Sequence, residues 1–189
     1  MTPTSDSEIQ QIVARVLSSL QPEAGTNQQP VGSPSGGSNH LVAIGADHGG
    51  FELKGILLPY LRDQGYEVLD CGAYSSQAVD YPDLAEAVGR KVASGEAWRG
   101  IVIDGAGIGS CMAANKVPGV RAALCYDHAT AVNSREHNDA NLLTLGAGLI
   151  GATLARQIAV TWLATEFGGG RHARRVEKIM ALESHAYAR

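Results

Sequence analysis

Short apolar runs alternate with stretches of helical periodicity from residue 40 onward, and this alternation constrains the fold more than any other feature. Runs typical of buried parallel strands occur at 41–46, 66–71, 100–105, 121–126 and 141–146. Helical segments are predicted between them, among them about 50–64 and 83–94, and then at 152–167 and from about Arg171. Parallel strands need crossover connections, which place helices on both faces of the sheet. We therefore predict a doubly wound α/β fold, a Rossmann-like three-layer αβα sandwich with a five-stranded parallel sheet.

The first 39 residues have a different composition. Residues 21–39 are rich in Pro, Gly, Ser, Gln and Asn, which predicts a disordered, flexible linker. Residues 1–20 contain a predicted amphipathic helix, in which Ser5 and Glu8 have the spacing of a capping box. A helix this short is marginal alone in water, so we expect it to dock either on its own domain, residues 40–189, or on a partner. Its apolar stripe consists of Ile9, Ile12, Val13, Val16, Leu17 and Leu20.

Charge, cysteine spacing and apolar run length exclude several classes of protein. With 15 Lys and Arg against 19 Asp and Glu, the net charge of −4 lacks the basic excess on which nucleic-acid binding depends. No apolar run approaches the roughly 20 residues that cross a bilayer. The three cysteines show no CxxC spacing and the histidines form no HxH or HxxxH pair. We therefore expect no disulfide framework and no metal site. We also expect no cofactor.

Residues suited to chemistry follow the predicted strands. Asp47 and His48 come after the first strand, and the segment 104–110, DGAGIGS, comes after the third. The motif REHND at 135–139 follows the fourth strand, and GGGRHARR at 168–175 follows the last long helix. Ligands of doubly wound sheets bind beyond the carboxyl ends of the strands. We therefore expect all four motifs to meet at that edge.

The glycine-rich segment 105–110 has two interpretations. It could be only a tight strand-to-helix turn. It does not match a dinucleotide-binding fingerprint, because Ser110 stands where the third glycine would be and the loop follows the third strand instead of the first. A glycine-rich loop that opens a helix nevertheless presents backbone N–H groups, which suit a phosphate or a developing oxyanion.

The histidine and arginine motifs also have structural alternatives. A lone histidine such as His137 is more often structural than catalytic, and an arginine pair is more often a solvated charged face. Arg171 and Arg175 are spaced i, i+4, so on one helical face both guanidinium groups could reach one anion. Their occurrence together with titratable groups favours binding of an anionic ligand.

Five sequence segments together resemble one known family. They are IGADHGGFELK, DYPDLA, the glycine-rich loop continued by AANKVPGVRAAL, SREHNDANLLTLG and GGGRHARRVEKI, in this order over about residues 40–183. The set is similar to the type B ribose-5-phosphate isomerases and the related galactose-6-phosphate isomerase subunits. The resemblance implies metal-independent interconversion of aldose and ketose phosphates through an enediolate. It also implies a cytoplasmic homodimer or tetramer with the active site between subunits.

The resemblance assigns a role to each motif. Asp47 and His48 would contact the sugar and its phosphate end, and Tyr81 would help to line the site. His137 would act as the acid/base of ring opening, and Asn138 would orient the substrate. The phosphate would be held by Arg171 and Arg175 with help from His172. The enediolate oxygen would be stabilised by the loop amides of Gly105, Ala106, Gly107, Ile108 and Gly109.

The position of the catalytic base departs from the family pattern. Members of the family carry the base either as Cys where this chain has Asp104, or as Glu where it has Ser110. We assign the base to Asp104, because a carboxylate at a strand end can accept the proton, and we include Ser110 among the catalytic positions. Cys111 opens the following helix and is interpreted as a packing residue.

The substituted base leaves several functions open. The chain could isomerise a different pentose or tetrose phosphate, require a different partner subunit, or bind a sugar phosphate without turnover. The amphipathic helix and linker resemble the encapsulation peptides of bacterial microcompartments. That resemblance implies a shell protein as partner of residues 5–20 and a location in the microcompartment lumen.

Overall fold

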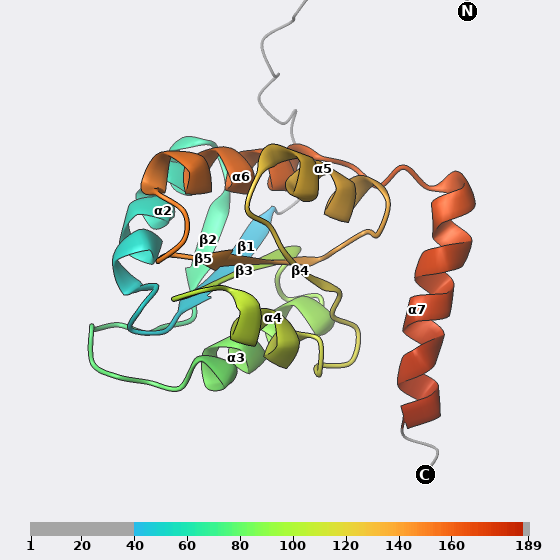
Figure 1. The fold of residues 1–189 in the computed structure, drawn as a ribbon, viewed down its shortest axis with the longest axis horizontal. Coiled ribbons are helices and arrows are strands. Elements are labelled where there is room, and N and C mark those ends of the chain that lie inside the picture. The colour runs from blue at the N-terminus through green and yellow to red at the C-terminus, as the bar shows by residue number, and fades with distance from the viewer. Residues whose placement is uncertain (1–39, 187–189) are drawn as a thin grey trace, which may run out of the picture. The chain divides into compact units, whose positions relative to one another are not determined.

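The computed structural model describes residues 40–186, so the helix and linker predicted for residues 1–39 lie outside the described residues. Its sheet is parallel, with the strand order β2-β1-β3-β5-β4 (Figure 1). The doubly wound α/β prediction is thereby confirmed. The fourth strand is shorter than the predicted 121–126. The strands are β1 Leu41–Ala46, β2 Glu67–Asp70, β3 Arg99–Asp104, β4 Ala122–Leu124 and β5 Leu142–Gly146.

Helices connect successive strands and extend beyond the last one. Pro82 lies in the first turn of α3, where a proline is tolerated because its missing N–H would have no intrahelical partner. Asp127 and Thr130 form a capping box that starts α5. A 3₁₀ turn, η1 Gly170–His172, precedes the last helix. The helices are α2 Phe51–Asp63, α3 Tyr81–Ala93, α4 Ile108–Ala114, α5 His128–Glu136, α6 Ala152–Ala164 and α7 Ala173–Ala186.

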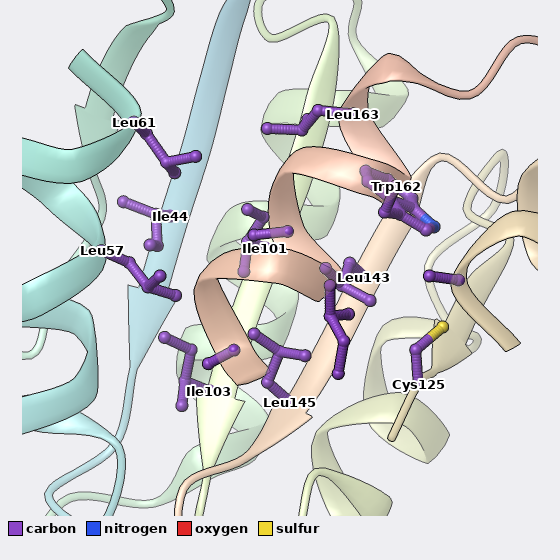
Figure 2. Close-up of a cluster of buried hydrophobic side chains, with 14 of the residues drawn as sticks. Ile44, Leu57, Leu61, Ile101, Ile103, Cys125, Leu143, Leu145, Trp162 and Leu163 are labelled. Carbon is purple, nitrogen blue, oxygen red and sulfur yellow. The ribbon is translucent and has the colours of Figure 1, made fainter. Parts of the chain in front are cut away.

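The hydrophobic core has two parts, one on each face of the sheet. One face packs against α2 and α6 and includes Leu57 and Trp162 (Figure 2). The other packs against α3 and α4 and includes Val88 and Val102. Two apolar layers on opposite faces of one sheet are the packing of an αβα sandwich. Among the described residues, none of the helices is long and apolar enough to cross a membrane.

A close approach of backbone to backbone fixes the turn after β1. A Cβ on Gly50 would overlap the carbonyl group of Ile103 in β3, so only glycine fits here. The Asp47 amide donates to the same Ile103 carbonyl at 3.1 Å. These contacts hold the Asp47–Gly50 turn against the end of β3, which is where the chemical residues of the first half of the chain gather.

Candidate functional site

The ends of β1 and β3 bring the first two motifs together. Asp47 is buried, and its Oδ1 accepts a hydrogen bond from the Gly50 amide at 2.9 Å. A Cβ on Gly49 would lie 3.3 Å from the Gly105 amide nitrogen, so the turn after β1 touches the start of the glycine-rich loop. The carboxyl edge of the sheet therefore carries a continuous polar surface from both motifs.

Asp104 ends β3, and the glycine-rich loop is wrapped around its carboxylate. Oδ1 accepts hydrogen bonds from the Ala106 amide at 2.8 Å and from the Gly107 amide, and Oδ2 accepts one from the Ser110 amide at 3.0 Å. Two of the amides predicted for the enediolate, those of Ala106 and Gly107, thus donate to Asp104 in this structure. The Asp104 carboxylate therefore holds the loop in place through three backbone hydrogen bonds.

Ser110 ends this loop, and Cys111, the next residue, is half-buried. The Ser110 side chain is fully buried, and its Oγ has no hydrogen-bond partner among the described residues. The contact that Ser110 makes with Asp104 is therefore through its amide. The Cys111 thiol is 3.5 Å from the Ala122 carbonyl oxygen, and burial raises the pKa of this thiol. Both observations fit the interpretation of Cys111 as a packing residue.

Tyr81 and His48 extend the same edge. A Cβ on Gly109 would lie 2.6 Å from the Tyr81 ring, so the ring lies directly over the glycine-rich loop. The Val79 amide donates to His48 Nδ1 at 3.5 Å, which places the segment between β2 and α3 beside the turn after β1. The structure thus brings Asp47, His48, Tyr81, Asp104 and the 105–110 loop to one place, as predicted.

Lys54 supports this edge, and the sequence reasoning missed it. Its side chain is 2% exposed, and Nζ lies 2.5 Å from Asp70 Oδ1 and 2.7 Å from the Ala73 carbonyl oxygen. Asp70 also accepts from the Gly72 amide at 2.9 Å, so the pair fixes the start of the segment that leads to Tyr81. The sequence feature that could have indicated this role is the position of Lys54 on the apolar face of α2, three residues before Leu57.

The remaining predicted residues lie at the opposite edge of the sheet, which makes the expectation of a single shared edge wrong. Asp139, next to Asn138, accepts from Arg121 at 3.0 Å, and Arg121 precedes β4. The Gly168 amide donates to the Glu136 carbonyl oxygen at 2.9 Å, so the chain between α6 and α7 passes beside the end of α5 (Figure 1). The motifs at 135–139 and 168–175 therefore meet near the amino ends of the strands.

At this amino edge two histidine rings are stacked beside two arginines. The rings of His137 and His172 have centroids 4.2 Å apart and an interplanar angle of 2°. Arg171 lies in the 3₁₀ turn, not in α7, so the regular helical face expected for the arginine pair does not form. Partial desolvation and the charges of His137, Arg171 and Arg175 lower the pKa of His172. This electropositive cluster suits an anionic group such as a phosphate.

The described chain shows two half-sites and no cluster of metal ligands. The carboxyl-edge half-site consists of Asp47, His48, Tyr81, Asp104 and the 105–110 loop. The amino-edge half-site consists of His137, Asn138, Arg171, His172 and Arg175. Within residues 40–186 no three His, Cys, Asp or Glu side chains are grouped to hold a metal ion. Parallel strands rise about 3.3 Å per residue, so the two edges are separated by the length of the sheet.

Comparisons with known proteins identify the family. A family model described as ribose/galactose isomerase matches residues 42–179. The chain belongs to this family. It is 45% identical over 142 residues to ribose-5-phosphate isomerase B of Escherichia coli K12, covering 75% of this chain and 95% of that protein. It is 42% identical over 140 residues to D-erythrulose-4-phosphate isomerase of Pectobacterium atrosepticum, covering 73% and 91% respectively.

Solved structures agree with this family assignment. The ribose-5-phosphate isomerase B of Clostridium thermocellum superposes with a TM-score of 0.76 at 51% identity, over 77% of this chain and 99% of that chain. The type B ribose 5-phosphate isomerase of Trypanosoma brucei gives a TM-score of 0.75 at 49% identity, over 77% and 99%. The chain is therefore a sugar-phosphate isomerase of this family, an aldose–ketose isomerase.

Proposed function

We propose that this protein interconverts an aldose phosphate and a ketose phosphate through an enediolate, with ribose 5-phosphate and ribulose 5-phosphate or a close analogue as the pair. The observation that carries the proposal is the position of Asp104. It ends β3 with its carboxylate 5% exposed, on the edge that also carries Asp47, His48 and Tyr81. The reaction moves one proton between adjacent carbons, so it needs a base within hydrogen-bond reach of both.

Asp104 supplies that base in our proposal. Its Oδ2 accepts one backbone hydrogen bond and its Oδ1 accepts two, so Oδ2 is the oxygen better placed to take the proton. The carboxylate would remove the C2 proton of the aldose and return it to C1 of the enediolate, without net oxidation. The first-turn amides of Ile108 and Gly109 are the donors we assign to the enediolate oxygen.

A second copy of the chain completes the site in our proposal. It would bring its His137, Asn138, Arg171 and Arg175 to the carboxyl edge of the first, because one chain holds these residues at the opposite edge. Exposed apolar side chains beside the glycine-rich loop support such an interface, since they would be covered in a dimer or tetramer. These side chains are Ile108 at 52%, Met112 at 67% and Leu149 at 61% exposed.

A four-carbon substrate is the alternative that a specific observation favours. One relative is named for D-erythrulose 4-phosphate. This chain has Asp104 at the position where the family resemblance implies a cysteine, and Ser110 where it implies a glutamate. Either substrate would place its phosphate on the Arg171 and Arg175 pair and its carbonyl end near Asp104.

The experiment compares turnover of ribose 5-phosphate and D-erythrulose 4-phosphate by the wild type, Asp104→Asn and Asp104→Cys. We expect Asp104→Asn to lower kcat by about 100-fold or more with little change in KM, because the amide cannot accept the proton. Asp63→Asn is the matched control, since Asp63 is exposed at the far end of α2 and should leave kcat unchanged. Full activity of Asp104→Asn would contradict the assignment of the base. Absence of turnover in the wild type would favour a binding protein.

We also propose that residues 1–39 address the enzyme to a microcompartment lumen, with residues 5–20 binding a shell protein. The support is that the family match begins at residue 42, whereas the sequence before it has the pattern of an encapsulation peptide. The isomerase relatives align with about three quarters of this chain. In our proposal, residues 1–39 are therefore a targeting segment that precedes the catalytic domain.

A further inference from the structure

Asn133 and His137 form a side-chain pair at the end of α5. They are spaced i, i+4, and Asn133 Nδ2 lies 2.8 Å from His137 Nδ1. A neutral imidazole carries its proton on one ring nitrogen only, and the hydrogen bond made by one nitrogen decides which. The direction of this hydrogen bond therefore determines whether Nδ1 or Nε2 of His137 carries the proton, and so whether Nε2 can donate to a ligand.

Asn138 fixes that direction. Its Nδ2 lies 3.3 Å from the backbone carbonyl oxygen of Asn133 and 3.4 Å from Asn133 Oδ1. A backbone carbonyl can only accept, so Asn138 must present its NH₂ group here. Asn133 must then turn its Oδ1 toward Asn138 and its NH₂ group toward His137. Because an amide NH₂ has no acceptor capacity, His137 Nδ1 accepts, and the proton is on Nε2.

We propose that Asn133 is a positioning residue that holds neutral His137 in the Nε2–H tautomer. The other contacts of the ring leave this edge available. Nε2 lies 4.0 Å from Glu136 Oε1, beyond hydrogen-bond distance. One face of the ring is covered by His172. The Nε2 atom of His172 accepts a hydrogen bond from Arg171 Nε at 3.4 Å. The Nε2–H group is thus presented next to the arginines that we assign to the phosphate.

The catalytic consequence rests on the proposed function. In a cyclic pentose 5-phosphate, ring opening breaks the C1–O4 bond, and the electron pair goes to O4. Water supplies the proton that O4 takes and receives the proton that the C1 hydroxyl loses, which leaves the C1 aldehyde. The neutral His137 ring stabilises the charge that develops on O4 through a hydrogen bond from Nε2–H. With the other tautomer, an Nε2 lone pair would face O4 and could not donate a hydrogen bond to it. A tetrose 4-phosphate has its O4 esterified and does not close this ring, so it needs no such step.

The test combines a spectrum with a substrate comparison, both on the full chain. Long-range ¹H–¹⁵N correlation NMR, recorded above the titration range of histidine, distinguishes the tautomers, and His137→Gln assigns the signal. We expect His137 to be Nε2–H in the wild type. In Asn133→Asp the carboxylate would accept from Nδ1 and convert His137 to the Nδ1–H tautomer. The kcat/KM for ribose 5-phosphate should then fall by about 10-fold or more, and that for D-erythrulose 4-phosphate by less than about 2-fold.

Two further variants separate the tautomer from charge and packing. Gln157→Glu adds the same charge at an exposed position of α6 and should change neither the spectrum nor kcat/KM. Asn133→Ala removes the pair without adding charge and should give a mixture of tautomers with an intermediate kcat/KM.

An Nδ1–H tautomer in the wild type would overturn the inference whatever the turnover. An equal loss on both substrates in Asn133→Asp would also overturn it, because the defect would not be confined to ring opening. Lack of turnover by the wild type would overturn the proposed function, while the nitrogen spectrum still decides the tautomer.

Discussion

The charged groups around His172 lead to a prediction about its pKa. Partial desolvation and three neighbouring positive or protonatable groups lower its pKa below the ordinary 6.5. A bound phosphate would oppose these effects, because it places negative charge beside the ring. We expect an NMR titration of the free chain to give a midpoint below 6.5 for His172, and inorganic phosphate to move it upward.

The Arg175→Gln variant tests the cause of this shift. Removing one cation should raise the pKa of His172 in the free chain and weaken its response to phosphate. Because the pKa in the folded chain is the lower one, the unfolded chain binds the proton more readily. The contribution of His172 to stability is therefore fully present above the unfolded pKa near 6.5 and is lost as the pH falls from there through the lower pKa of the folded chain. An unchanged midpoint in Arg175→Gln would show that this arginine does not act on the ring.

Single residues also show where sequence reasoning reached its limit. The sequence placed Asp104 at the position of the family's catalytic base. The three backbone amides that donate to its carboxylate could not be predicted, because the sequence of a loop does not specify which acceptor its N–H groups will contact. Lys54 was missed because a lysine within a helical stripe is ordinarily solvent-exposed. Its burial depends on Asp70, which is sixteen residues away and belongs to another element.

At the scale of elements, the segment between β2 and α3 is anchored by α2. Lys54 pairs with Asp70, and its Nζ lies 5.3 Å from the centroid of the Tyr74 ring. Replacing Lys54 by Met keeps the volume and leaves Asp70 without its partner. We expect a loss of about 3 kcal/mol in the free energy of unfolding, measured by urea denaturation. Because the segment leads to Tyr81 at the start of α3, KM for the sugar phosphate should rise as well.

The control for this variant is Lys91→Met. Lys91 lies 2.7 Å from Glu96 in a pair with exposed fractions of 40% and 51%, so its removal should cost less than about 1 kcal/mol. Equal losses from the two variants would contradict an anchoring role for Lys54.

Elements also explain why one prediction of the site failed. All five strands and the order of helices were predictable from apolar runs, since each run is bounded by polar or glycine residues. The edge of the sheet, carboxyl or amino, at which each motif lies could not be predicted in this way. His137 follows a nine-residue helix that starts after β4, and at about 1.5 Å per residue such a helix returns the chain about 14 Å toward the amino edge. A motif at the end of a crossover helix therefore lies opposite one at its start.

At the scale of the whole molecule, the N-terminal 39 residues should be separable from catalysis. We expect a chain lacking residues 1–39 to retain kcat and KM, because the family match starts at residue 42. The same deletion should abolish cosedimentation with purified microcompartment shells. A variant with Ile12, Val16 and Leu20 changed to serine keeps the length of the segment and should show the same loss of binding. Unfolding of the truncated chain would instead show that the segment packs on its own domain.

The separation of the half-sites makes a prediction that only an assembly can satisfy. Asp104→Asn inactivates the carboxyl-edge half-site, and His137→Gln inactivates the amino-edge half-site, so each variant alone should be nearly inactive. In a symmetric dimer with shared sites, random pairing of the two variants makes half of the dimers mixed. Each mixed dimer has one site with both defects and one with none.

Co-expression of the two variants with different affinity tags should therefore restore about a quarter of wild-type turnover on ribose 5-phosphate, and about half in the purified mixed dimer. Mixing Asp104→Asn with Asp104→Ala, which places both defects in the same half-site, is the control and should restore nothing beyond the activity of the parents. If the mixed dimer were no more active than its parents, the site would have to form within one chain. The amino-edge residues would then need another explanation than binding the substrate of the neighbouring copy.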